Sequence, residues 1–167
     1  MPPKVHLAQV NIGRMKGPLD GPIMAGFAAR LDEINALADG SPGFVWRFQG
    51  AEGNATYLRP YDDDRVIFNM SVWETPDALH AFVYQTAHLE LLRQRHEWFG
   101  KFEAAYAALW WVPEAHRPSV GEAKQRLAHL DEHGPTPFAF TFRRMFPPDE
   151  KLIETTDWSQ LGPCPPA

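Results

Sequence analysis

The side chains best suited to chemistry alternate along one predicted strand, Arg65–Trp73. Because neighbouring side chains of a strand point to opposite faces, Asn69, Ser71 and Trp73 share a face with Ile67. An unpaired buried polar group costs about 1–3 kcal/mol, so a carboxamide, a hydroxyl and an indole on one face indicate a ligand pocket. The opposite face is entirely apolar and is expected to pack on helices: it carries Val66, Phe68, Met70 and Val72.

The first predicted strand, Val5–Met15, repeats this pattern, because Gln9 and Asn11 share a face. Aromatic residues elsewhere would wall the pocket, while amides, hydroxyls and an arginine would orient a ligand. An alternative remains open, in which the amides bond each other or ordered water inside a dimer interface. The residues predicted to bind substrate are Trp46, Arg47, Ser71, Arg93, Trp111 and His116.

Histidines offer a proton acceptor, since imidazole titrates near neutral pH. His88 lies two helical turns before His96, and we expect it to act as a general base or to bond a backbone carbonyl. Arg93 would hold an anionic substrate group at the cavity rim or pair with a surface acid. His116, close to Trp111, would line the mouth of a cavity. No histidine or carboxylate spacing is typical of a metal site, so none is predicted.

Composition limits the class of protein. The chain has 167 residues, a net charge of −5 and one cysteine, Cys164. An acidic chain gives no electrostatic support for a nucleic-acid partner, and no apolar run reaches the roughly 18 residues of a membrane span. We therefore expect a cytoplasmic protein that binds a small molecule and contacts neither nucleic acid nor membrane.

The elements that must position these residues follow the order βαββαβ, which is the ferredoxin-like arrangement. A helix from Pro76 to about Phe99, interrupted near Thr86, is predicted before the strand Ala105–Val112. A capping box at Ser119 and Glu122 predicts a third helix, followed by a fifth strand, Phe138–Phe142. We therefore expect an α+β domain over residues 1–148 with a C-terminal αβ extension, and a proline-rich tail over 149–167. Helices on one sheet face would leave the other for a ligand or a second copy, which predicts a homodimer.

Several segments carry a resemblance to known proteins. The chain resembles a bacterial family of uncharacterised proteins that is similar to the antibiotic-biosynthesis monooxygenases of the dimeric α+β barrel superfamily. The segments that carry the resemblance are HLAQVNIGR (6–14), SPGFVWRFQ (41–49), FNMSVWETPDALHAFVYQTAHLELLRQRHEWF (68–99), WWVPEAHRPSVGEA (110–123) and GPTPFAFTFR (134–143). The resemblance implies a dimeric α+β barrel.

The resemblance also implies a chemistry. Anthrone-type monooxygenases of this superfamily carry an Asn on the first strand and an Asn-x-x-x-Trp run on the third, which correspond here to Asn11, Asn69 and Trp73. An aromatic or polyketide-type substrate would lose a proton, and its carbanion would reduce O₂ without metal or flavin. The amides would stabilise the oxyanion and the indole would orient the ring. The implied catalytic residues are Asn69, Trp73 and Asn11, with His88 as proton acceptor.

Two other functions stay open. Some relatives bind haem through a histidine of the second helix, but their ligand position falls near Leu92 rather than on His88 or His96. The third hypothesis is a dimer that binds a ligand or is purely structural, without catalysis.

Overall fold

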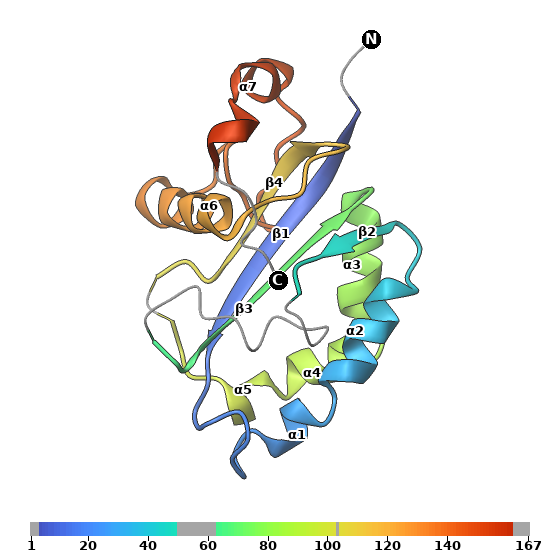
Figure 1. The fold of residues 1–167 in the computed structure, drawn as a ribbon, viewed down its shortest axis with the longest axis vertical. Coiled ribbons are helices and arrows are strands. Elements are labelled where there is room, and N and C mark those ends of the chain that lie inside the picture. Colours follow the sequence, from blue (N-terminus) through green and yellow to red (C-terminus); the bar gives the residue numbers. More distant parts are fainter. Residues whose placement is uncertain (1–3, 50–62, 103, 162–167) are drawn as a thin grey trace.

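The computed structural model describes residues 4–49, 63–102 and 104–161 (Figure 1). Four strands and the helices around them make up this part of the chain. In chain order the elements are β1 (Val5–Arg14), α1 (Ala25–Ala28), α2 (Leu31–Asp39), β2 (Phe44–Arg47), β3 (Val66–Trp73), α3 (Pro76–Gln85), α4 (His88–Arg93), α5 (Arg95–Trp98), β4 (Ala107–Pro113), α6 (Val120–His133), α7 (Glu150–Thr155) and a 3₁₀ turn, η1 (Trp158–Leu161).

The sheet confirms the predicted fold class. Its strand order is β2-β3-β1-β4, and every neighbouring pair is antiparallel. With helices between β1 and β2 and between β3 and β4, this is the ferredoxin-like α+β arrangement. The two central strands, β1 and β3, carry the candidate polar residues, so each strand is hydrogen-bonded on both edges.

Local capping sets the helix boundaries. Thr75 Oγ1 accepts a hydrogen bond from the Ala78 amide at 3.1 Å, and Pro76 occupies the first position of α3. Ser119 Oγ accepts from the Glu122 amide at 3.0 Å at the start of α6. The predicted capping box is therefore half formed, because the Glu122 carboxylate bonds the Trp110 indole instead.

The predicted interruption near Thr86 is confirmed. Thr86 adopts an extended backbone, with φ −126° and ψ −177°, and so ends α3. Its hydroxyl donates to the Phe82 carbonyl and accepts from the His88 amide. The side chain thereby replaces backbone bonds that the broken helix has lost, and it sets the start of α4.

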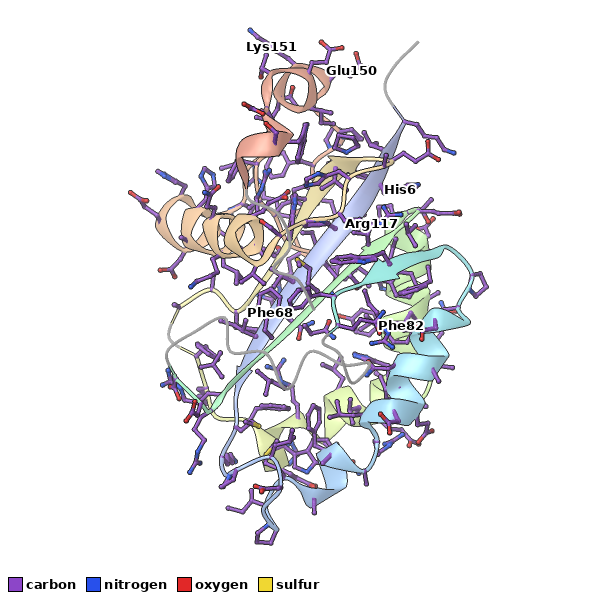
Figure 2. The ribbon with its side chains drawn as sticks, in the orientation of Figure 1. His6, Phe68, Phe82, Arg117, Glu150 and Lys151 are labelled. Carbon is purple, nitrogen blue, oxygen red and sulfur yellow. The ribbon has the colours of Figure 1, made fainter. Side chains whose placement is uncertain are left out.

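The apolar face of β3 packs on a helix as expected, but our expectation that helices cover only one face of the sheet was wrong. Val66, Phe68, Met70 and Val72 pack against α6, which follows the ferredoxin-like unit, rather than against α2 and α3. In Figure 2 the labelled Phe68 and Phe82 lie on opposite sides of the sheet. Helix α6 presents three apolar residues to this face: Ala123, Leu127 and Leu130.

The face that carries Trp73 is the one covered by α2 and α3. Trp73 is 1% exposed and stacks on Phe82 of α3, with ring centroids 5.1 Å apart. Both faces therefore have helices in the single chain, and the open face predicted for a partner sheet is absent from the described structure (Figure 1). None of the described helices is both long and apolar enough to cross a bilayer.

The C-terminal segment packs against the outer edge of β4. The predicted strand Phe138–Phe142 is not formed as a strand, because Phe140 makes only one bridge, a reciprocal backbone pair with Leu109 at 2.8 and 2.9 Å. Residues assigned to the tail form α7, whose Ile153 is buried. The Trp158 indole donates to the Ile153 carbonyl at 3.0 Å and so fastens η1 to α7.

We predict that the packing of α6 on the sheet is a major source of stability. Leu127 is 4% exposed, and Leu127→Ala should lower the free energy of unfolding by about 2–5 kcal/mol in urea titration. The control is Gln125→Ala, an exposed position on the same helix, which should change it by less than about 0.5 kcal/mol. Equal effects of the two substitutions would contradict the placement of α6.

Candidate functional site

A chain of five polar side chains crosses the two central strands. The antiparallel register places Asn11 opposite Asn69 and Gln9 opposite Ser71. Trp73, two residues beyond Ser71, lies on the same face of β3. The structure thus brings together four residues predicted for the site, which are Asn11, Asn69, Ser71 and Trp73.

Gln9 is the centre of this amide chain. Its Nε2 donates to Asn69 Oδ1 at 2.8 Å and to Ser71 Oγ at 2.7 Å, while its Oε1 accepts from Asn11 Nδ2 at 3.0 Å. Ser71 Oγ also accepts from Trp73 Nε1 at 2.9 Å. Both N–H donors and one acceptor position of the Gln9 carboxamide are therefore used, and these bonds fix its orientation.

The chain turns the Asn69 amide group outward. Asn69 Oδ1 accepts from Gln9 and also from Asn11 Nδ2, at 3.3 Å, whereas Asn69 Nδ2 has no acceptor among the described residues. Gln9 and Ser71 are 8% and 7% exposed, but Asn11 and Asn69 are exposed. The site therefore presents oriented N–H donors on a buried support, which is an arrangement suited to binding a developing oxyanion.

Two apolar clusters flank the amides along β3. At one end, Trp73 packs with Phe82 and the residues of α2 and α3. At the other end, Ile67 packs beside Phe27 and Trp98, which come from α1 and α5. Leu91 of α4 packs against both clusters. Aromatic side chains thus stand on both sides of the polar group.

His88 lies near the site but does not touch the amide chain. Its ring is 5.0 Å from the Phe82 ring, which stacks on Trp73 in turn. His88 Nδ1 lies 3.3 Å from the Val83 carbonyl oxygen, an acceptor, so the proton belongs on Nδ1. Burial lowers the pKa of His88, against a smaller opposing effect of the Val83 bond. The ring is therefore neutral at pH 7, with Nε2 unprotonated.

Of the other predicted binding residues, Arg47 lies beside the amide chain, whereas Trp46 and Arg93 do not. Arg47 is paired with Ser71 across β2 and β3, and its Nε donates to Asp39 at 2.8 Å. Trp46 packs with the opposite cluster, on the α6 side. Arg93 is exposed on α4.

Trp111 and His116 lie toward the C-terminal segment. The Trp111 indole donates to the Phe146 carbonyl at 2.9 Å. His116 Nε2 lies 2.6 Å from a carboxylate oxygen of Glu122, on the α6 side of the sheet. His116 is therefore engaged away from the amide chain, whereas Trp111 packs with the cluster that contains Trp73.

Gln9 is the residue that the predicted site omitted. Its signal was present, since it shares a face with Asn11, but only the register between β1 and β3 shows that it faces Ser71.

The position that corresponds to the haem ligand of some relatives, Leu92, lies half-buried on α4. The His96 ring is exposed, with Nδ1 at 3.2 Å from the Arg93 carbonyl oxygen. Among the described residues, no three His, Cys, Asp or Glu side chains are grouped to hold a metal ion.

Fold and site together define a ferredoxin-like α+β domain with a polar site between its sheet and helices. The chain belongs to the family described as "Domain of unknown function (DUF3291)", which matches residues 6–156. The resemblance to a family of uncharacterised proteins is thereby confirmed. Among curated proteins, none matches the chain.

Several solved structures are similar to this chain at low sequence identity. NE2512, a protein of unknown function from Nitrosomonas europaea, is 11% identical with a TM-score of 0.45, over 68% of this chain and 93% of that chain. SnoaB, a cofactor-independent oxygenase from Streptomyces nogalater, is 19% identical with a TM-score of 0.45, over 67% and 95%. PA3566 from Pseudomonas aeruginosa is 14% identical with a TM-score of 0.39, over 67% and 96%.

We predict that the Ser71 hydroxyl is required for stability as well as for the site. Ser71→Ala removes the acceptor shared by Gln9 and Trp73, which leaves two buried donors unpaired. The free energy of unfolding should fall by about 2 kcal/mol, measured by urea titration. A change below about 0.5 kcal/mol would contradict the proposed bonding, and Ser159→Ala, at an exposed hydroxyl, is the control.

We also predict that His88 makes the fold sensitive to mild acid. Its pKa is lowered from 6.5 in the folded state, so the unfolded chain binds more protons as the pH falls below about 6.5. The stability contributed by neutral His88 is complete above pH 6.5 and is lost as the pH falls through the folded pKa. His88→Phe should therefore reduce the dependence of the unfolding free energy on pH below 6.5. An unchanged dependence would show that His88 does not contribute.

Proposed function

We propose that this protein is a cofactor-independent oxygenase that acts on a small aromatic molecule at the exposed end of the amide chain. The observation that carries the proposal is the outward Asn69 Nδ2 group, which the internal bonds of Gln9 and Asn11 hold in place. Donors that are already oriented need no reorganisation when negative charge develops on a substrate oxygen.

The reaction that fits such a site starts from an electron-rich ring with an acidic C–H bond beside a carbonyl or phenol. Loss of the proton gives an enolate whose oxygen would accept hydrogen bonds from Asn69. The enolate carbon then reduces O₂ by one electron and combines with it to form a hydroperoxide. Loss of water from the hydroperoxide turns a CH₂ group into a carbonyl, so one molecule of O₂ yields one product oxygen and one water.

His88 is the proposed proton acceptor. Its lowered pKa and its Nδ1 contact with Val83 support a neutral ring whose Nε2 can take a proton. The Phe82 ring packs between His88 and Trp73. We therefore propose that the substrate binds at Asn69, on the exposed side of the amide chain, with its reacting carbon toward His88.

We further propose that the protein acts as a homodimer. Because both sheet faces are covered within one chain, the contact would use another surface, and the outer edge of β2 is a candidate, since an edge strand offers unpaired backbone groups. Light scattering after gel filtration should give twice the mass of 18.9 kDa. A single-chain mass would refute dimerisation without affecting the proposed chemistry.

We predict that the purified protein consumes O₂ when supplied with an anthrone or a hydroquinone. Asn69→Ala should lower kcat by about 10²–10³-fold, because one oriented donor to the oxyanion is lost. Asn69→Asp, which keeps the shape but replaces the donor with a negative charge, should be at least as impaired. An oxygen electrode and product analysis measure both effects.

Gln125→Ala, at an exposed position of α6 outside the site, is the matched control and should keep full activity. O₂ uptake that neither Asn69 substitution changes would refute the assignment of Asn69 as the oxyanion donor. Saturable binding of the aromatic compound without O₂ uptake would favour the non-catalytic hypothesis. A Soret band near 400 nm that disappears with His88→Ala would favour haem.

A further inference from the structure

The C-terminal end of α6 carries two histidines whose rings lie close together. His129 and His133 are four residues apart, so they share one face of the helix, and their ring centres are 4.6 Å apart. A carboxylate oxygen of Glu132 lies 3.6 Å from His133 Nε2. The three residues form the run His-x-x-Glu-His, in which the two histidines of a helix hold zinc in one class of metalloenzyme. This run was not among our predictions, which found no spacing typical of a metal site.

The loop that follows α6 holds the His129 ring in one orientation. Gly134, with a φ of 73°, ends the helix and reverses the chain. The loop then places Thr136 Oγ1 at 2.8 Å from His129 Nε2. The His129 ring also packs on Phe138, with ring centres 4.7 Å apart. Histidines that bind metals usually bond their second ring nitrogen in this way, because that bond orients the ring and leaves the other nitrogen for the ion.

The protonation of His129 suits a metal ligand. Burial is the largest cause that lowers its pKa, followed by the nearby His133 and Arg126, while Glu132 has an opposing effect. The ring is therefore neutral at pH 7. Metal binding requires this form, because a protonated imidazole has no lone pair to give to an ion.

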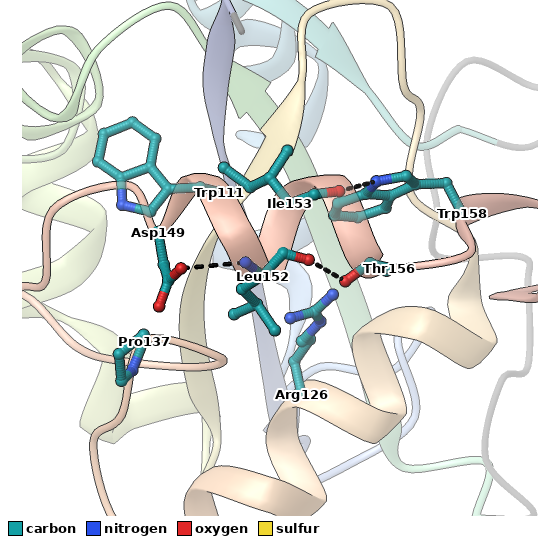
Figure 3. Close-up of a pocket in the computed structure, with 8 residues that line it drawn as sticks. All are labelled: Trp111, Arg126, Pro137, Asp149, Leu152, Ile153, Thr156 and Trp158. Carbon is teal, nitrogen blue, oxygen red and sulfur yellow. Dashed lines mark hydrogen bonds between the residues drawn. The ribbon is translucent and has the colours of Figure 1, made fainter. Parts of the chain in front are cut away.

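The local charges also permit a cation at this position. Arg126 lies about one turn earlier on α6, but its Nη2 is 3.8 Å from the Glu122 carboxylate, which balances its charge. Its guanidinium borders a small cavity at α7 (Figure 3). At the end of α6 the helix dipole contributes partial negative charge, and Glu132 adds a full one. A divalent ion beside His133 is thus stabilised by both.

We propose that His129, through Nδ1, and His133 bind a divalent transition-metal ion such as Zn²⁺ or Ni²⁺ at the end of α6. Imidazole nitrogens suit these ions and bind Zn²⁺ at about 2.0–2.1 Å. The His133 side chain is 51% exposed, so its ring can turn toward the ion. In the part of the chain that the structure describes, no three His, Cys, Asp or Glu side chains are grouped for a metal, so water completes the coordination. The site is separate from the amide chain and independent of the proposed oxygenase chemistry.

Helix α3 offers a matched comparison within the same chain. His80 and Tyr84 are also four residues apart, with ring centres 4.6 Å apart and ring planes at 43°, against 4.6 Å and 44° for the α6 pair. The described structure shows no hydrogen bond that holds the His80 ring. Tyr84→His therefore gives α3 a histidine pair of the same spacing without a residue in the role of Thr136. This variant separates a prepared site from the effect of spacing alone.

The test adds Zn²⁺ to the full-length protein at pH 7 and follows the imidazole nitrogens by NMR after ¹⁵N labelling of the histidines. We expect His129 Nδ1 and one nitrogen of His133 to shift together and to saturate at one ion per chain. Mg²⁺, which prefers oxygen ligands, should shift neither ring. A Kd above about 1 mM, or an equal response to Mg²⁺, would overturn the proposal.

Two substitutions should weaken the binding of Zn²⁺. His133→Gln, which removes a ligand, should raise Kd by at least about tenfold, since even a residue that only orients a metal ligand is worth about 10–100-fold. Thr136→Val, which removes the hydroxyl beside His129, should raise Kd by about tenfold. His80→Gln, at an exposed histidine of α3, is the control and should bind like the native protein. If Thr136→Val does not fold, the titrations of the native protein and of His133→Gln still decide the question.

The double variant His133→Gln, Tyr84→His keeps a histidine pair of this spacing only on α3. We expect it to bind Zn²⁺ at least about tenfold more weakly than the native protein, because nothing orients the His80 ring. Equal affinity of the two proteins would show that spacing alone binds the ion and would overturn the proposal of a site prepared by Thr136.

Discussion

The site depends on one buried carboxamide. Gln9 bonds Asn69, Ser71 and Asn11 at once, and so joins the two central strands through side chains as well as backbone. Its burial makes each of these bonds expensive to break. Because the Asn69 oxygen is committed to this network, the Asn69 amide group has one orientation, toward the exposed side. The chemistry proposed for the molecule follows from that orientation.

The two faces of the sheet differ in what covers them and in which polar groups they leave exposed. On one side, α2 and α3 pack around Trp73, while Asn11 and Asn69 stay exposed between apolar clusters. On the other side, α6 seals the apolar residues of β3 and brings Glu122 and Arg126 against Trp110. This additional layer distinguishes the chain from a bare ferredoxin-like unit, whose second sheet face needs a partner. It also places Arg126 beside a small cavity at α7.

Strand alternation predicted which side chains share a face, and here it was correct for Asn69, Ser71 and Trp73. It could not predict what covers each face, because that depends on which helix packs where. The apolar stripe of α6 was recognisable, yet nothing local showed that it would cover Phe68. The break at Thr86 was anticipated, and there the Thr86 hydroxyl bonds the Phe82 carbonyl and the His88 amide. The role of Gln9 required the register between β1 and β3, which no single segment contains.

The most direct test of this account is hydrogen exchange of the side-chain amides in ¹⁵N-labelled protein. The account predicts that the Gln9 NH₂ protons, buried and bonded to two acceptors, exchange far more slowly than those of a free amide. The Asn69 NH₂ protons should exchange at nearly the free rate. The reverse pattern, with Asn69 protected and Gln9 freely exchanging, would contradict the orientation on which the site depends.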